Sequence, residues 1–358
     1  MTNVNPSLLK TKQHFNILDG LRGVAALAIV AFHFMEVVFE FSKNILGHGF
    51  LAVDFFFCLS GFVIAYAYDD RLEKMGIMEF FKSRVIRLHP LVIFGSVLGL
   101  LTFLFDPFSG TAAQYSIGKI TLLFLTSALL IPFPTMEDRY FNNFGLNAPA
   151  WSLFWEYVAN IFYAFVLYKL PKKYLIILAC TAAVILIGVA YHAGSLLGGW
   201  AGENFWEGGA RIFYSFIAGL IIYRYNWIIK NKLGFIGLSI LLLLAFFMPY
   251  SSYNWLTESF VVVIYFPLLV SLGAGTVATQ GLHKLCIFSG KISYPLYMTH
   301  YMAIWIFANY YNTYKPEGLK LALVISCGII ALVSLAYLTM ILFDIPIRKY
   351  LSKKRIKA

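Results

Sequence analysis

Residues 18–37, LDGLRGVAALAIVAFHFMEV, decide the fold, because they are apolar apart from four ionisable side chains. A run of about 20 apolar residues spans the hydrocarbon core of a bilayer, so the stretch is predicted to be a transmembrane helix. An ionisable group in that core is costly unless it faces the inside of a helix bundle or a wet cavity. The helix is therefore expected to turn one stripe to a protein interior, along which lie Asp19, Arg22, His33 and Glu36.

The rest of the chain has the same character. Of its 358 residues, 60% are hydrophobic and 13% are charged, whereas about a quarter of the residues of a soluble domain are charged. Apolar runs recur along the whole length, which predicts an all-α polytopic membrane protein. We expect one transmembrane domain over residues 15–350, between a cytoplasmic segment at 1–14 and a basic cytoplasmic tail at 351–358. The net charge of +11 indicates basic cytoplasmic loops and contact with membrane lipid, with no nucleic acid as a partner.

Eleven apolar runs are candidate spans, and eleven crossings would leave the basic ends of the chain on opposite sides, which the positive-inside rule disfavours. The run at 117–133 contains Lys119 and ends in IPFP, so we expect it to be re-entrant or interfacial. Ten spans with both termini cytoplasmic then place 21 Lys and Arg residues inside and five outside. The candidate runs are 19–40, 49–68, 88–105, 117–133, 150–168, 174–190, 210–226, 233–249, 258–275, 292–310 and 319–342.

Helix geometry sets the depth of the polar groups. Arg22 and His33 are eleven residues apart, which is about three turns and about 16 Å along the axis. Asp54, in the second and antiparallel run, falls within about one turn of the depth of His33. A carboxylate beside a histidine fixes its tautomer and raises its basicity. Either Asp54 or Glu36 is therefore expected to orient His33.

Two later runs add polar groups. Ser152 and Glu156 are four residues apart and share a face in the outer half of their helix, and His300 lies near the middle of the membrane. One buried histidine on an apolar helix is more often a hydrogen-bonded packing residue than a functional one. The convergence of His33, Asp54 and Glu156 at one depth favours a functional cluster around His33, whereas a packing role is favoured for His300.

A basic motif lies at 80–91, FFKSRVIRLHPL. Arg84 and Arg87 are three residues apart and share a face where the second loop enters the next helix. Paired guanidinium groups bind a phosphate bidentately. The same two residues are also what a positive-inside topology signal needs. These two interpretations have nearly equal weight on physical grounds alone.

Taken in order, these motifs resemble the membrane acyltransferase-3 family over residues 15–350. Arg22 and His33 match its R-x10-H motif, and Arg84 and Arg87 match its R-x-x-R motif. Each motif is weak by itself, but the ordered set is specific. The stretches that carry the resemblance are LDGLRGVAALAIVAFH, GHGFLAVDFFFCLSGFVI, FFKSRVIRLHPL, APAWSLFWE and SYPLYMTH.

The resemblance implies an enzyme of the inner or plasma membrane that moves an acyl group, often acetyl, from cytoplasmic acyl-CoA to a hydroxyl group. The acceptor in the family is an envelope glycan, a lipid-linked sugar or a small metabolite. His33 would be the essential catalytic residue, and Arg84 and Arg87 would engage the donor. Acyl-CoA would be a co-substrate, with no further cofactor and no metal. The extracytoplasmic SGNH domain of some relatives is not expected here, and Asp344 stands where many relatives have Glu.

Residue chemistry and resemblance together give a hypothesis. The CoA phosphates bind Arg84 and Arg87 with help from Arg22, and the pantetheine arm follows the polar stripe to His33. This histidine acts as general base toward the acceptor hydroxyl, and Ser152, Glu156 and His300 lie on the acceptor side. Direct transfer and an acyl-His33 intermediate are both open. The rival class is a membrane transporter or exporter, because carriers also have embedded segments and charged helices.

The acceptor is not identified by these motifs. The loop at 198–211, GGWAGENFWEGGAR, is rich in aromatic residues. Its rings would stack on a sugar with Glu203, Glu207 and Arg211 as hydrogen-bonding groups, or they anchor the protein at the membrane interface, which is the favoured reading.

Overall fold

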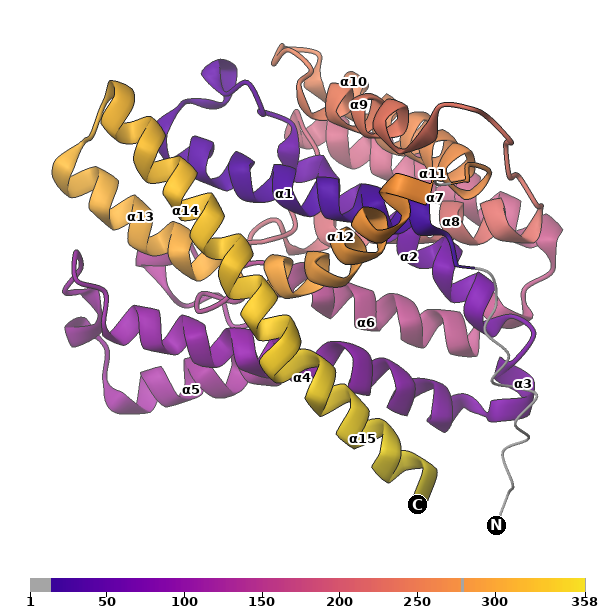
Figure 1. Ribbon diagram of the computed structural model, residues 1–358, viewed down its shortest axis with the longest axis horizontal. Coiled ribbons are helices and arrows are strands. Elements are labelled where there is room, and N and C mark those ends of the chain that lie inside the picture. Colours follow the sequence, from indigo (N-terminus) through magenta and orange to yellow (C-terminus); the bar gives the residue numbers. More distant parts are fainter. Residues whose placement is uncertain (1–13, 278–279, 358) are drawn as a thin grey trace.

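The computed structural model describes residues 14–277 and 280–357, and Figure 1 shows a helical bundle in which many long helices lie along one direction. One isolated antiparallel bridge joins Asn142 to Ala201 in the described chain. The α-helices are α1 (Asn16–Val38), α2 (Ala52–Tyr68), α3 (Leu72–Met75), α4 (Ile77–Leu104), α5 (Ile117–Ala128), α6 (Ala150–Phe165), α7 (Lys172–Ala193), α8 (Phe205–Arg224), α9 (Gly234–Phe246), α10 (Asn254–Phe260), α11 (Phe266–Ala274), α12 (Gln280–Thr299), α13 (Tyr301–Tyr314), α14 (Gly318–Thr339) and α15 (Ile345–Lys357).

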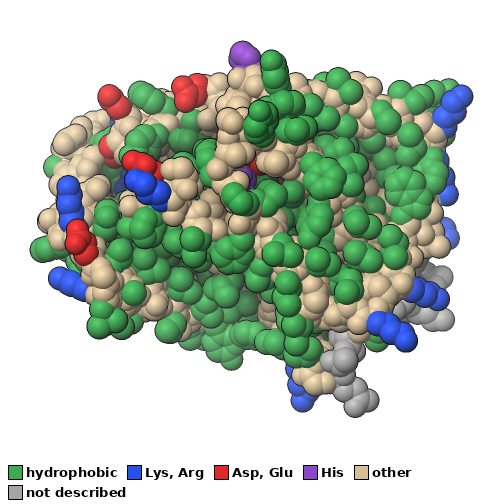
Figure 2. Space-filling view, turned by 90° about the horizontal axis from the view of Figure 1, so that it is seen from above, with side chains coloured by type: hydrophobic (Ala, Val, Ile, Leu, Met, Phe, Trp, Pro, Cys, Tyr) green, Lys and Arg blue, Asp and Glu red, His purple; other side chains and the backbone are tan. Residues whose placement is uncertain are grey.

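The predicted class is confirmed, because within 14–277 and 280–357 seven helical segments are long and apolar enough to cross a membrane. The face drawn in Figure 2 has a broad hydrophobic band with charged side chains mainly at its two ends. The chain is thus a multi-pass membrane protein. Ten crossings and cytoplasmic termini stay predictions. The seven segments are Asn16–Val38, Gly49–Tyr68, Ile77–Leu104, Lys172–Ala193, Phe205–Arg224, Asn254–Ala274 and Gly318–Arg355.

The segment at 117–133 turns back on itself. Its helix α5 has 12 residues and is about 18 Å long, which is too short for a hydrocarbon core of about 30 Å. Lys119 Nζ, near the start of α5, donates to the backbone oxygen of Thr135 at 3.1 Å. The Tyr115 hydroxyl donates to Asp138 across the same two flanks. The segment therefore begins and ends at one level, as a segment that does not cross would; its place in the membrane stays a prediction.

One end of the bundle, here called the inner end, gathers the segments that were predicted to share the cytoplasmic side. Arg355 of α15 donates to Glu79 of α4 at 2.6 Å. Arg224, at the end of α8, pairs with Asp69 at 2.7 Å and donates to the Leu167 backbone oxygen at 2.9 Å. Figure 1 places α3 and the end of α15 toward this same side. The opposite end is called the outer end.

Close backbone packing holds α2 against α8. A Cβ atom added to Gly61 would lie 2.0 Å from the Phe216 backbone oxygen, and one added to Gly219 would lie 2.0 Å from that of Cys58. Small residues permit such close approach, which is typical of packed membrane helices. The contact fixes the register in which Asp54 of α2 faces Arg211 of α8.

Three boundaries differ from the prediction. Helix α4 begins at Ile77, so the R-x-x-R motif lies on a helix and not in a loop. The charged residues before residue 88 lower the hydropathy of the segment, although Lys and Arg are good helix formers. A search for apolar runs therefore places the start of this helix too late. The predicted span at 292–310 is two helices that meet at His300. Pro295, which lacks a backbone N–H, precedes this break by one turn. The tail at 351–358 continues α15 as far as Lys357.

Candidate functional site

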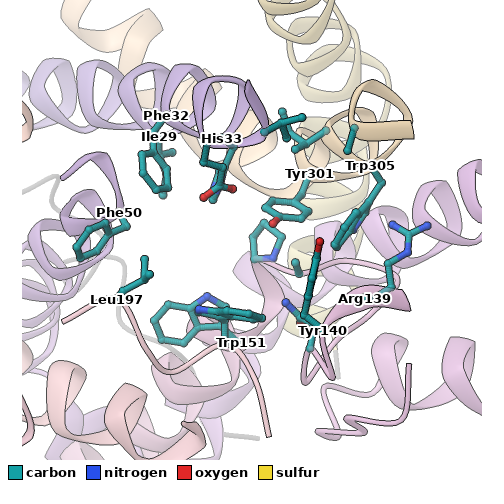
Figure 3. Close-up of a pocket in the computed structure, with 18 of the residues that line it drawn as sticks. Ile29, Phe32, His33, Phe50, Arg139, Tyr140, Trp151, Leu197, Tyr301 and Trp305 are labelled. Atoms are coloured by element: carbon teal, nitrogen blue, oxygen red, sulfur yellow. The ribbon is translucent and has the colours of Figure 1, made fainter. Parts of the chain in front are cut away.

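A cavity of about 430 Å³ opens near the outer end, between α1, α6, α8, α13 and the loops around residues 140 and 200. We call it the outer chamber. Figure 3 shows Ile29, Phe32 and His33 of α1 facing Trp151 and Leu197 across the open space. The remaining wall is largely aromatic, with Phe41, Phe50, Tyr140, Trp200, Tyr301 and Trp305.

His33 and Glu36 form a pair on the wall of this chamber. His33 Nδ1 lies 2.5 Å from Glu36 Oε1, one turn along α1, and the two side chains are 15% and 21% exposed. An ionised carboxylate only accepts hydrogen bonds, so Nδ1 is the donor and Nε2 keeps its lone pair. The Tyr301 ring stands edge-on to the imidazole at 4.7 Å. The pair is a histidine oriented by a carboxylate and accessible from a cavity, an arrangement that is chemically suited to proton abstraction.

His300 lies behind this pair. Its ring is stacked on that of His33 with centroids 5.3 Å apart, and the residue is fully buried. Its Nδ1 donates to the backbone oxygens of Tyr297 and Leu296, at 2.8 and 3.2 Å. Its Nε2 has no hydrogen-bond partner among the described residues. For His300 a packing role was favoured, with a place on the acceptor side in the hypothesis; the structure shows it buried and stacked on His33.

Asp54 does not orient His33, and that part of the hypothesis is wrong. The Asp54 carboxylate receives two hydrogen bonds from Arg211, from Nη2 at 2.6 Å and from Nε at 3.1 Å. Both residues are buried at 1% exposure. The depth estimate placed Asp54 near His33 but said nothing about azimuth, and α2 turns this carboxylate toward α8. The alternative that the sequence left open, Glu36, is the residue in contact.

Two further cavities continue from the outer chamber toward the inner end. The middle cavity, of about 150 Å³, shares Val53 and Tyr297 with the outer chamber. The inner cavity, of about 410 Å³, shares Arg22, Arg84 and Arg87 with the middle cavity. The three cavities therefore adjoin along the length of the bundle. Arg22 and His33 lie on different cavities of this series, which confirms that the polar stripe of α1 faces the interior.

At the junction between the outer chamber and the middle cavity, two hydroxyl groups meet. The Ser152 hydroxyl lies 2.8 Å from the Tyr297 hydroxyl and donates to the Pro149 backbone oxygen at 2.9 Å. Because its one proton is used there, Tyr297 is the donor to Ser152. Ser152 and Glu156 line the middle cavity, so the structure places neither on the wall of the outer chamber, where an acceptor was expected.

The predicted donor-binding arginines differ in their partners. Arg84 is buried and donates to Glu156 Oε1 at 2.9 Å, an oxygen that also accepts from Ser60 at 2.5 Å. Arg87 lines the middle and inner cavities, and its side chain makes no hydrogen bond to the residues that the structure describes. Of the two, Arg87 has the guanidinium that is open to a ligand.

Arg22 ties α1 to α12 at the border of the inner and middle cavities. It donates to the Gly290 backbone oxygen at 2.6 Å and to Ser293 Oγ at 3.0 Å, and it lies 3.1 Å from Asp19. Arg348 and Lys291 also line the inner cavity, and Arg348 pairs with Asp344. The inner cavity thus combines several cations with two carboxylates, and Arg22 has both a structural role and a face on the cavity.

The sequence did not single out several residues of the outer chamber. Tyr297, Tyr301 and Trp305 belong to or follow the SYPLYMTH stretch, whose periodicity could have flagged them. Arg139 was counted only as an outer charge, yet it is 7% exposed and lines the chamber. Burial lowers the pKa of Arg139, while nearby Asp138 and Asp106 act in the opposite direction; an arginine so placed remains a cation at neutral pH.

The aromatic residues at 198–211 were expected either to bind a sugar or to anchor the protein at the membrane interface, and the structure places them differently from one another. Trp200 and Arg211 line the outer chamber, whereas Trp206 is 77% exposed. Arg211 is engaged by Asp54 and by the Gly198 backbone oxygen at 2.7 Å. The described residues contain no group of three or more His, Cys, Asp or Glu side chains placed to hold a metal ion.

The chain matches the acyltransferase domain family over residues 15–341, so it belongs to that family and is an acyltransferase by class. No solved structure matches the chain.

Three relatives show the range of the similarity. "Protein 2 in picA locus" of Rhizobium radiobacter is 35% identical over 50% of this chain and 96% of its own length. A putative O-acetyltransferase of Staphylococcus aureus is 27% identical over 82% of this chain and 51% of its own length. O-acetyltransferase OatA of Staphylococcus aureus is 24% identical over 93% of this chain and 57% of its own length. The chain thus spans about half the length of these two staphylococcal relatives.

Proposed function

We propose that the protein is a membrane O-acyltransferase, with acetyl as the transferred group and acetyl-CoA as the donor. The observation that carries the proposal is the His33–Glu36 pair, which lies on an outer chamber adjoining arginine-lined cavities. The acetyl group is supported by the names of the two staphylococcal relatives. The acceptor is a hydroxyl group of an envelope glycan, a lipid-linked sugar or a small metabolite, and the protein lies in the inner or plasma membrane.

The donor enters from the inner end. Its phosphates are held in the inner cavity by Arg87, with Arg22 and Arg348 as further cations, because guanidinium groups pair bidentately with phosphate oxygens. The pantetheine arm extends through the middle cavity past Ser152 and Tyr297. The thioester then lies at the junction with the outer chamber, between the donor path and His33.

The reaction is a direct acyl transfer. His33 Nε2 takes the proton of the acceptor hydroxyl while the hydroxyl oxygen forms a bond to the thioester carbonyl carbon. The C–S bond then breaks, and the protonated His33 returns the proton to the departing thiolate. Glu36 holds the imidazole in the tautomer with a free Nε2 and stabilises the imidazolium. General base assistance of this kind contributes about 10²- to 10⁴-fold to the rate.

The test uses the purified full-length protein in lipid nanodiscs with labelled acetyl-CoA. Arg87→Gln should weaken acetyl-CoA binding about 10-fold or more, because hydrogen bonds to charged groups are worth about 1.5–3 kcal/mol. His33→Gln should leave that binding unchanged and lower transfer about 10²- to 10⁴-fold. Lys173→Gln and His192→Gln, at exposed positions, are the matched controls. Full transfer by folded His33→Gln protein would refute the mechanism, and an acetyl-His33 adduct found by mass spectrometry would replace direct transfer with a two-step route.

The acceptor is found by a second experiment. Envelope glycans and lipids from cells with the intact protein and with the His33→Gln variant are compared by mass spectrometry. The expected result is one species that lacks an acetyl mass in the variant. Movement of a solute across the membrane without any acylated product would favour the carrier class instead.

A further inference from the structure

Two arginines line the outer chamber, and they differ in how their hydrogen-bonding capacity is used. Arg211 donates to both carboxylate oxygens of Asp54 and to the backbone oxygens of Gly198 and Phe50. Arg139 is 7% exposed, but its guanidinium makes no hydrogen bond within the part of the chain that the structure describes. Buried cations are normally paired and hydrogen-bonded. Arg139 therefore has donors available for a partner from outside the chain.

The surroundings of Arg139 leave only the edge of its guanidinium accessible. The group lies over the Trp305 ring at 4.1 Å and near the Phe103 ring at 5.6 Å. Asp138 approaches Nε to 3.6 Å, beyond hydrogen-bond length, and this carboxylate accepts the Tyr115 hydroxyl. Because aromatic rings lie against the plane of the guanidinium and Asp138 lies on its Nε side, the two terminal amino groups are the ones left to bind a ligand. Two coplanar donors of this kind match the oxygens of a phosphate or carboxylate.

Aromatic contacts connect Arg139 to the proposed base. The His33 and Tyr301 rings are 4.7 Å apart, the Tyr301 and Trp305 rings are 5.4 Å apart, and Arg139 follows at 4.1 Å. Figure 3 shows Trp305 between Tyr301 and Arg139. An anionic group on Arg139 is therefore separated from His33 by a row of two aromatic side chains. One extended acceptor can lie along this row with its hydroxyl at His33.

The acidic groups around the chamber are engaged by other donors. Glu36 accepts from His33, and Asp54 accepts from Arg211. Asp106 accepts from Asn309 at 2.7 Å and from the Phe108 backbone N–H at 2.9 Å. Asp138 is ion-paired with Arg139 Nε at 3.6 Å without a hydrogen bond, so the terminal amino groups of Arg139 keep their donors for a ligand.

We propose that Arg139 is an anion-binding subsite of the outer chamber, which selects an acceptor that carries a phosphate or carboxylate group. The identity of this ligand as the acceptor rests on the proposed acyltransferase function. The anion site itself rests only on the burial, the stacking and the missing hydrogen bonds of Arg139. It gives specificity to one end of the chamber, away from the bond that is made.

Calorimetric titration of the full-length protein in phosphatidylcholine nanodiscs tests the subsite. Saturating CoA is included to occupy the inner cavity, and the probes are glucose 6-phosphate, glucuronic acid and glucose. One or both charged probes should bind at least about tenfold more tightly than glucose, since charge-assisted bonds are worth about 1.5–3 kcal/mol and each 1.4 kcal/mol is tenfold. Preference for glucose 6-phosphate identifies a phosphate acceptor, and preference for glucuronic acid identifies a carboxylate.

Variants of Arg139 test whether this residue causes the preference for charged probes. Arg139→Gln should weaken charged probes about 10- to 100-fold and leave glucose unchanged. Arg139→Lys keeps a point charge but loses the fork, so it should retain part of the preference. Lys320→Gln removes an exposed charge of α14 and should change nothing. Unchanged affinities in Arg139→Gln, or equal affinities of the parent protein for all three probes, would overturn the proposal.

Failure of the anion subsite and failure of the acyltransferase function would give different results. CoA binding measured in every variant reports whether the protein is folded. If the protein prefers anions through Arg139 but transfers no acyl group, the proposed function is wrong and the anion subsite is supported. Acyl transfer to charged and neutral acceptors at equal rates, unchanged by Arg139→Lys, would remove the subsite and keep the function.

Discussion

The protein contains two histidine–glutamate pairs near its outer end, and they are built differently. His33 and Glu36 are one turn apart on α1, lie 2.5 Å from each other and are partly open to the chamber. His48 and Glu258 come from distant parts of the chain, lie 3.3 Å apart and are fully buried. Similar side chains therefore occur once on a cavity wall and once in a packed interior.

The partners of the second pair indicate a structural role. His48 Nδ1 lies 3.1 Å from the Met248 backbone oxygen, and Glu258 Oε2 accepts the Leu196 backbone N–H at 2.5 Å. The pair therefore joins the loop before α2, the helix α10 and the loop after α7. No face of it is accessible to a substrate. The difference from the first pair lies in access, because the residue types are the same and only His33 and Glu36 are partly exposed.

The strongest test of this comparison is to remove the proposed base. His33→Gln should lower acyl transfer about 10²- to 10⁴-fold with little effect on folding, because Nε2 loses its role as general base. Transfer is measured with labelled acetyl-CoA, and the thermal unfolding temperature is measured in parallel. The matched change His48→Gln should preserve the transfer rate per folded molecule. If both variants lost transfer equally while folded, access to the chamber would not distinguish the pairs.

The second test changes the orienting carboxylate. Glu36→Gln keeps the size of the side chain but removes its charge, so it should reduce transfer about tenfold to 1,000-fold by loosening the required tautomer. The affinity for acetyl-CoA should stay unchanged, since Glu36 lies on the outer chamber and not on the inner cavity. A variant with unaltered kcat would show that His33 needs no carboxylate.

A third test concerns the Asp54–Arg211 pair, a buried pair of another kind beside the chamber. Asp54→Asn leaves the Arg211 charge buried without its counter-ion, which should lower the free energy of unfolding by about 3–5 kcal/mol. The stability loss is measured by thermal or denaturant unfolding in detergent. The material that stays folded should keep most of its transfer activity. If Asp54→Asn protein were stable but had lost acyl transfer, Asp54 would have a role in catalysis.

The smallest effect is expected at the buried histidine. His48→Gln should lower the free energy of unfolding by about 1–3 kcal/mol, because Glu258 loses a partner in a dry interior. Glu258→Gln should do the same, and the double change should cost less than the two single changes together, since both act on one contact. Additive losses would mean that the two side chains stabilise the fold independently.

The charged helix α1 was predictable because its periodicity and its polar residues obey two simple rules. Apolar runs of sufficient length become membrane helices, and costly charges turn inward. His33 with Glu36 was one of two alternatives, and one helical turn guarantees their proximity. The error with Asp54 has a physical reason: depth along a helix follows from residue number, but direction around it depends on which neighbour packs there, here α8 through Gly61 and Gly219.

The outer chamber was less predictable. Its wall combines α1 with side chains such as Arg139, Trp151 and Trp305, which lie far apart in the sequence. A tryptophan near the membrane surface has the same sequence signature whether it anchors the protein or lines a cavity. Trp206 is exposed and Trp200 lines the chamber, although they are only six residues apart in the sequence.

The sequence by itself determined a polytopic helical membrane protein, a short segment at 117–133 that is not a full span, the polar stripe of α1 and the family likeness. Each of these follows from local composition or from spacing along one helix. Only the tertiary structure decided which carboxylate meets which cation, that Arg84 is engaged by Glu156, and that Arg139 lines the chamber with no side-chain hydrogen bond to a described residue. These are contacts between segments that are distant in the sequence. The direction in which each side chain points around its helix axis depends on how the helices pack, and the period of a single helix does not determine it.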